Sequence, residues 1–114
     1  MIEGCSFGSI VINGRRYTRD LIIYPDGRIE DGWWRRRGHR LTADDIRALT
    51  DSRPEVIVAG TGVFGRMKPD PGLAGRLEEL GIAFVALANK KAMARFNAEH
   101  RAGRRVGACF HLTC

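Results

Sequence analysis

Val106-Gly-Ala-Cys-Phe-His-Leu-Thr-Cys114 is an apolar run with the pattern of a β-strand, and the sequence ends inside it. A chain that ends within such a run is expected to bury it rather than leave it exposed as a tail. The segment is therefore predicted to be an inner strand, paired on both sides, with Leu112 in the core. Burial of an aliphatic side chain contributes about 1.5–3 kcal/mol, so the segment is expected to be essential for folding.

Two further apolar runs precede this segment, each separated from the next by a helical pattern. Glu55 to Ala59 and Ile82 to Leu87 are apolar on both faces, as in strands covered by helices on both sides of a sheet. Asp70-Pro71 is predicted to open one helix, with proline at its first position, and Asn89 to cap another. A glycine follows each helical pattern, as is common after helices. This order predicts an α/β sheet with crossover connections.

The first third of the sequence predicts β-structure. Asn13-Gly14, a strong hairpin signal, separates Ser9 to Ile12 from Tyr17 to Tyr24, and both runs are rich in β-branched and aromatic residues. Pro25-Asp26-Gly27 predicts a second turn, followed by a strand from about Ile29 to Trp34. An amino-terminal meander is therefore expected to pack beside the α/β sheet or over one of its ends.

One short helix is predicted between the two halves. Thr42 is expected to be its N-cap, and Asp44 and Asp45 lie in its first turn, where the helix dipole favours acidic residues. Pro54 prevents the helix from continuing.

The composition indicates one cytoplasmic domain without a membrane span. The chain has 114 residues and is 44% hydrophobic, enough for one core. No apolar run approaches the roughly 18 residues of a membrane helix, and the start lacks the pattern of a signal peptide. The three cysteines, with no Cys-x-x-Cys, argue against a disulfide framework or a zinc module. The net charge of +6 favours anions, nucleic acid or an acidic protein surface as partners.

Gly60-Thr-Gly-Val-Phe-Gly65 matches the glycine pattern of dinucleotide-binding loops. A helix should follow such a loop at once, and an acidic residue should follow the next strand. Neither is present, so no cofactor is predicted, and the loop is expected to line a cleft at the carboxyl ends of the strands. Lys90-Lys91 lies in the first turn of a predicted helix, where the dipole disfavours positive charge. A bound anion would offset that penalty, and two solvated lysines are the alternative. The candidate pocket comprises Gly60, Thr61, Gly62, Lys90 and Lys91.

Two other patterns have simpler structural interpretations. Trp33-Trp34, followed by three arginines, combines aromatic and cationic residues as in single-stranded nucleic acid binding, but one core Trp beside a solvated basic turn is favoured. Strand alternation places Cys109 and His111 on one face and Cys114 on the other, so His111 and Cys114 cannot cooperate. A hydrogen-bonded core histidine is favoured, and no catalytic or metal-binding residue is predicted.

A series of short motifs in a specific order covers nearly the whole chain. They are Asp20-Leu-Ile-Ile23, Pro25-Asp-Gly27, Trp33-Trp34-Arg35, Gly38-His39, Pro54-Glu55, Gly60-Thr-Gly62, Gly81-Ile82, Ala92, Asn97, Gly103, Val106 and His111-Leu-Thr-Cys114. In this order they resemble the Mth-type domain family of unknown function, which includes an adipogenesis-associated protein and a mitochondrial complex I assembly factor.

The resemblance implies a single domain over residues 1–114 with a three-layer β+α/β/α fold and a mixed central sheet. It implies no established enzymatic activity. The leading hypothesis is a small non-catalytic domain that acts through protein–protein contacts, for example in the assembly of a larger complex. The alternative is an anion- or small-molecule-binding protein, or an enzyme, with its site at the Gly60–Gly65 loop and Lys90-Lys91.

Overall fold

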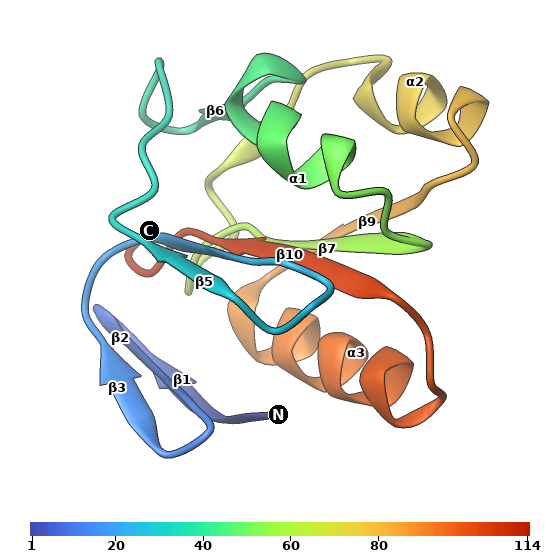
Figure 1. The fold of residues 1–114 in the computed structure, drawn as a ribbon. Helices are drawn as coiled ribbons and strands as arrows, with labels where there is room; N and C mark the ends of the chain where they lie inside the picture. The colour runs from blue at the N-terminus through green and yellow to red at the C-terminus, as the bar shows by residue number, and fades with distance from the viewer.

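A mixed sheet of five strands lies at the centre of the computed structural model, which describes residues 1–114 (Figure 1). The strands are β4 (Leu21–Ile23), β5 (Ile29–Asp31), β7 (Val56–Gly60), β9 (Ala83–Leu87) and β10 (Val106–Phe110). Their order is β5-β4-β10-β7-β9. β10 pairs parallel with β7 and antiparallel with β4, which confirms the predicted inner strand.

The last strand is shorter than predicted. It ends at Phe110, after which the Leu112 amide donates to the Asp20 carboxylate (2.8 Å) instead of a neighbouring strand. The Leu112 carbonyl accepts from the amide of Gly8 (2.8 Å). Leu112 is nevertheless buried, with 1% of its surface exposed, as predicted.

Helix α3 and a small antiparallel sheet cover one face of the central sheet (Figure 1). α3 spans Asn89–Arg101, and the small sheet contains β1 (Ile2–Ser6), β2 (Ser9–Ile12) and β3 (Arg15–Tyr17). The predicted amino-terminal meander therefore exists, but it contains different strands from those predicted. The chain leaves the small sheet after Tyr17 and enters the central sheet at Leu21, so the run from Tyr17 to Tyr24 is divided between two sheets.

Two short helical segments cover the opposite face (Figure 1). The first combines a 3₁₀ turn, η1 (Asp44–Ile46), with α1 (Arg47–Asp51), and the second is α2 (Leu73–Glu79). The parallel pair β6 (Arg40–Leu41) and β8 (Lys68–Pro69) joins the connecting segments on this side. The chain thus has the predicted three-layer α/β fold with a mixed central sheet. None of its helices combines the length and hydropathy needed to cross a membrane.

The two faces of the central sheet form separate cores. On the α3 face, Phe110 and Leu112 pack in one buried cluster with Phe96 and residues of the small sheet. On the other face, Cys109 packs with Leu49 and Leu73 of the short helices. Cys109 and Phe110 therefore lie on opposite faces, as strand alternation predicted.

The predicted turns are confirmed, but the helices begin at other residues than predicted. Asn13 and Gly14 have φ angles of 50° and 81° in the two-residue turn between β2 and β3, as a primed hairpin turn requires. Ala43 and not Thr42 is the N-cap of η1, but Thr42 and Asp45 still bond reciprocally, each backbone amide donating to the other's side chain (2.9 and 3.4 Å). The second helix does not open at Pro71, because Gly72 has a φ of 87° and is not helical, so α2 begins at Leu73.

Candidate functional site

The Gly60–Gly65 loop lies directly beside the start of α3, as expected from two segments that follow neighbouring parallel strands. The Gly62 amide donates to Oδ1 of Asn89 (3.0 Å), and the Asn89 amide donates to the Gly62 carbonyl (3.1 Å). Asn89 is therefore not the N-cap of α3. Ala88 occupies that position, and the buried Asn89 side chain also donates to the His111 carbonyl (2.7 Å). This side chain links three segments, a role that the sequence pattern did not predict.

The loop does not present the exposed amides that an anion site would need. The amides of Thr61, Val63 and Gly65 donate to the carbonyls of Leu87 (2.9 Å), Thr113 (2.7 Å) and Gly62 (3.2 Å). Gly60, Thr61 and Gly62 are themselves buried.

Close packing explains Gly60 and Gly62 in this loop. A Cβ at Gly60 would meet the Phe110 ring and lie 2.7 Å from Oδ1 of Asn89, and one at Gly62 would meet the Cys114 backbone. The glycines thus allow segments to approach closely, and this half of the candidate pocket belongs to the interior.

Lys90 and Lys91 are exposed and line a groove beside the loop. Neither lysine takes part in an ion pair. Burial raises the pKa of the Cys5 thiol even though the nearby Lys90 charge lowers it, so the thiol is not activated as a nucleophile. The residues that line the groove are Cys5, Ser6, Val63, Ala88, Asn89, Lys90 and Lys91.

Two exposed aromatic residues each follow, in the chain, a residue that lines the groove. Phe7 follows Ser6 and is 59% exposed, and Phe64 follows Val63 and is 68% exposed. Their ring centroids are 6.5 Å apart. Sequence reasoning did not select this aromatic pair, because the two residues come from distant loops that only the fold brings together.

A second group of polar side chains, the polar cluster of Asp20, Arg35 and His111, lies inside the fold. Oδ2 of Asp20 accepts from Nη1 of Arg35 (2.8 Å) and lies 2.8 Å from Nδ1 of His111. Burial alone would raise the pKa of Asp20. Hydrogen bonds from His111, the Leu112 amide and Arg35 outweigh that effect and hold the pKa below its ordinary value.

The surroundings of the polar cluster indicate a structural role. Arg35 also donates from Nε to the Gly38 carbonyl (2.7 Å), and its guanidinium lies 4.9 Å from the Trp33 ring. Nε2 of His111 is 3.3 Å from Oγ1 of Thr113, which places a carboxylate, an imidazole and a hydroxyl in series. A hydrolytic triad uses such a series. Here, however, the carboxylate is already paired with Arg35. Nη2 of Arg35 also lies 2.9 Å from Nδ1 of His111, but a ring nitrogen that donates to Asp20 cannot accept from Arg35 as well.

The sequence prediction for His111 is confirmed, since it is a hydrogen-bonded histidine with 6% exposure. One core Trp is confirmed, but the predicted strand ends at Asp31, before both tryptophans, and Arg35 of the predicted solvated basic turn is buried. Trp33 is 5% exposed and donates from Nε1 to the Asp45 carbonyl (2.8 Å), whereas Trp34 is 80% exposed. Cys5, Cys109 and Cys114 are unpaired thiols. No group of three His, Cys, Asp or Glu side chains is arranged to hold a metal ion.

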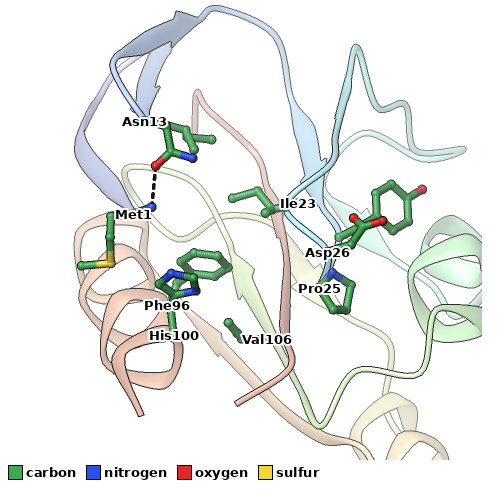
Figure 2. Close-up of a pocket in the computed structure, with 11 residues that line it drawn as sticks. Met1, Asn13, Ile23, Pro25, Asp26, Phe96, His100 and Val106 are labelled. Carbon is green, nitrogen blue, oxygen red and sulfur yellow. Dashed lines mark hydrogen bonds between the residues drawn. The ribbon is translucent and has the colours of Figure 1, made fainter. Parts of the chain in front are cut away.

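Figure 2 shows a second pocket, between the β2–β3 turn, the β4–β5 turn and α3. Ile23, Phe96 and Val106 form apolar walls, and His100 stacks on Phe96 with an interplanar angle of 4°. The polar groups at its rim include Asp26 and the terminal amine of Met1, which donates to Oδ1 of Asn13 (2.8 Å). Charges of both signs border this pocket, so its chemistry favours no particular class of ion.

Comparison with known proteins identifies the family. Residues 2–111 match the family described as "Protein of unknown function (DUF498/DUF598)". The solved structure named MT938 is 29% identical, with a TM-score of 0.83 over 100% of this chain and 98% of that one. A conserved hypothetical protein from Pyrococcus horikoshii is 27% identical, with a TM-score of 0.82 over 100% and 99% of the two chains.

A third solved structure carries the name of the domain type. A protein from Bordetella pertussis, described as a Mth938-like domain, is 20% identical, with a TM-score of 0.71 over 98% of this chain and 85% of that one. At this identity the similarity shows the fold, and the family match shows the relationship. The chain therefore belongs to the DUF498/DUF598 family of proteins of unknown function, and it is an Mth-type domain.

Proposed function

We propose that this domain is a non-catalytic binding module that recognises an acidic and apolar segment of a protein partner at the groove and the aromatic pair. The observation that carries the proposal is the position of Phe7 and Phe64, both mostly exposed, beside a groove with two lysines that have no ion-pair partner. Exposed aromatic side chains next to a concave surface are typical of binding sites, because their burial supplies much of the affinity.

The charge of the site supports a partner with carboxylates. Lys90 and Lys91 lie in the first turn of α3, where the positive end of the helix dipole adds to their own charge. No acidic side chain lies in that turn, and the whole chain carries a net charge of +6. An acidic residue of a partner would relieve this repulsion, and an adjacent apolar residue would cover the aromatic pair.

The reactive groups of the chain support a role without catalysis. Burial raises the pKa of Cys109 to about 12, so this thiol remains protonated at neutral pH. The pKa of Cys5 is also raised by burial. His111 is buried and bonded to Asp20 inside the polar cluster. None of these groups has the exposure and activation expected of a nucleophile or a general base.

Assembly of a larger complex is the form of this role that the family resemblance supports. The partner segment would belong to another subunit, and the domain would hold it during assembly. Three unpaired cysteines suit a reducing compartment, which supports a cytoplasmic location as part of the same proposal.

The test is an NMR titration of the full chain with short peptides that alternate Leu and Glu, matched by peptides that alternate Leu and Lys. The acidic peptide is expected to shift the amides of Val63, Ala88 and Lys90, and the basic peptide is not. Phe64→Ser and the double variant Lys90→Ala with Lys91→Ala should each weaken binding at least several-fold. Lys68→Ala, at an exposed lysine outside the groove, is the matched control and should bind normally.

Phosphate and acetate titrations separate the alternative function from this one. Shifts at Lys90 and Lys91 with these anions, no response to the acidic peptide and no effect of Phe64→Ser would support a small-anion site instead. Equal binding of acidic and basic peptides, or unchanged binding by both groove variants, would contradict the proposal.

A further inference from the structure

Strand β9 forms one edge of the central sheet, and the backbone groups of two of its five residues have no partner. The Ala83 amide donates to the Glu55 carbonyl (3.0 Å), and the Leu87 carbonyl accepts from the Thr61 amide (2.9 Å). Because successive backbone groups of a strand point to opposite sides, residues 83, 85 and 87 bond towards β7. The amides and carbonyls of Phe84 and Ala86 therefore point outward, and neither residue has a backbone bond outside the sheet ladder.

The opposite edge of the sheet is protected against further pairing, whereas β9 is not. β5 is three residues long, carries Glu30 and Asp31, and has Arg19 paired with Asp31 at its side (3.0 Å). β9 has the sequence AFVAL, with no charge and no proline, and its register with β7 is regular. Charges and short length are the usual protection of an edge strand, and their absence favours pairing with another strand.

Charges of opposite sign lie at the two ends of β9. Glu78 and Glu79, at the end of α2, precede the strand, and Lys91 follows it at the start of α3. All three side chains belong to exposed residues without ion pairs. Leu80, beside Glu79, is 65% exposed. An antiparallel neighbour of the same sequence would bring each acidic end next to a basic end.

The two lysines of α3 point to different sides of the helix. Asn97 bonds to the backbone of Ile2 in β1, and Lys90, seven residues earlier, shares its face. Lys91 is about 100° further around the helix and so faces a different side. Lys90 is therefore the lysine nearest Cys5 in the groove, whereas Lys91, which also borders the groove, remains exposed and without an ion pair.

We infer that two copies of this chain associate through antiparallel pairing of their β9 strands, forming one continuous sheet across a twofold axis. Phe84 of one copy lies opposite Ala86 of the other, with Val85 at the axis, so that all four outward-pointing residues exchange hydrogen bonds. The contact is isologous, as in most homodimers. Lys91 of each copy lies near Glu79 of the other, and the two Leu80 side chains lose exposure. This inference rests on the β9 edge and not on the proposed groove function, although the two proposals share Lys91.

Sedimentation equilibrium of the full chain over a range of concentrations tests the inference. The expected result is a reversible dimer with twice the 12.7 kDa mass of the chain. Ala86→Pro removes an amide that has no partner within one copy, and it should give a folded monomer at the same concentrations. Binding of the acidic peptide by this monomer would show that the groove and the dimer are separate.

A charge exchange keeps the test decisive if Ala86→Pro does not fold. Glu79→Lys replaces the attraction between Lys91 of each copy and Glu79 of the other by repulsion. It should raise the dimer dissociation constant about tenfold. The double variant Glu79→Lys with Lys91→Glu should restore most of the affinity, and Glu30→Lys on the β5 edge should leave it unchanged. A chain that remains monomeric at high concentration, or a dimer unaffected by Ala86→Pro and Glu79→Lys, would overturn the inference.

Discussion

The polar cluster and the groove lie at the same end of the central sheet and differ in how their polar groups are bonded. In the polar cluster, the Asp20 carboxylate accepts hydrogen bonds from Arg35 and His111 inside the fold. In the groove, Lys90 and Lys91 have no ion-pair partner and lie beside two exposed phenylalanine rings. A buried charged group must be paired to be tolerated, and an exposed charge need not be. The comparison indicates that the polar cluster stabilises the fold and that the groove is available for binding.

The largest expected effect is loss of folding when residues 111–114 are deleted. The deletion removes His111 from the polar cluster together with Leu112, whose surface is 1% exposed. Leu112→Ala alone should lower the free energy of unfolding by about 2–5 kcal/mol, whereas Leu80→Ala, at a leucine that is 65% exposed, should change it by about 0.5 kcal/mol or less. Solubility and thermal unfolding are the measurements. A truncated chain with an unchanged melting temperature would contradict the assignment of this segment to the core.

Asp20→Ala should produce the next largest effect, because it leaves the buried Arg35 without its carboxylate partner. Removing one member of a buried ion pair lowers stability by about 3–5 kcal/mol. Asp31→Ala breaks the exposed pair with Arg19 and should lower stability by about 1 kcal/mol at most. Urea unfolding measures the loss of unfolding free energy in each variant. Equal losses would show that the polar cluster stabilises the fold no more than an exposed ion pair does.

Gly60→Ala should destabilise the chain by about 1–3 kcal/mol, because the added methyl group must displace the Phe110 ring or the Asn89 amide. Gly75 in α2 has no heavy atom within 4 Å of its added Cβ. Gly75→Ala should therefore stabilise the chain, by roughly 0.5–1 kcal/mol. Opposite shifts of the two melting temperatures are expected, and parallel shifts would contradict the close packing of the loop.

The stability that Asp20 supplies should depend on pH. Its folded-state pKa lies below the ordinary value of 3.8, so the contribution is complete well above that pH. It is lost as the pH falls from about 5 through 3.8 towards the lowered pKa. The difference in unfolding free energy between the wild type and Asp20→Asn should shrink over this window. A difference that stays constant from neutral to acidic pH would show that the Asp20 carboxylate is not selectively stabilised in its charged form.

Phe64→Ser should have the smallest effect on stability, about 0.5 kcal/mol or less, because the side chain is 68% exposed. It should nevertheless abolish most of the binding to the acidic peptide. A large loss of stability would show that Phe64, like the polar cluster, stabilises the fold and is not simply available for binding.

Local patterns in the sequence predicted most of the elements. The turn at Asn13-Gly14, the helix ends at Gly81 and Gly103, and the apolar strands depend on nearby residues, and all of them are present. Helix starts were less predictable. Pro71 matched the preferred first residue of a helix, but the conformation of Gly72 delayed α2, and the Asn89 side chain bonds across the loop instead of capping α3.

The α/β class, the inner position of the last strand and the burial of Leu112 could be predicted from local patterns, because hydrophobic periodicity and turn chemistry act over a few residues. Which polar groups meet depends instead on how the whole chain folds. Asp20 and His111 are 91 residues apart in the chain, and Phe7 and Phe64 come from separate loops. Whether a side chain is paired, buried or available for binding depends on these long-range contacts, and the order of strands in the sheet creates them.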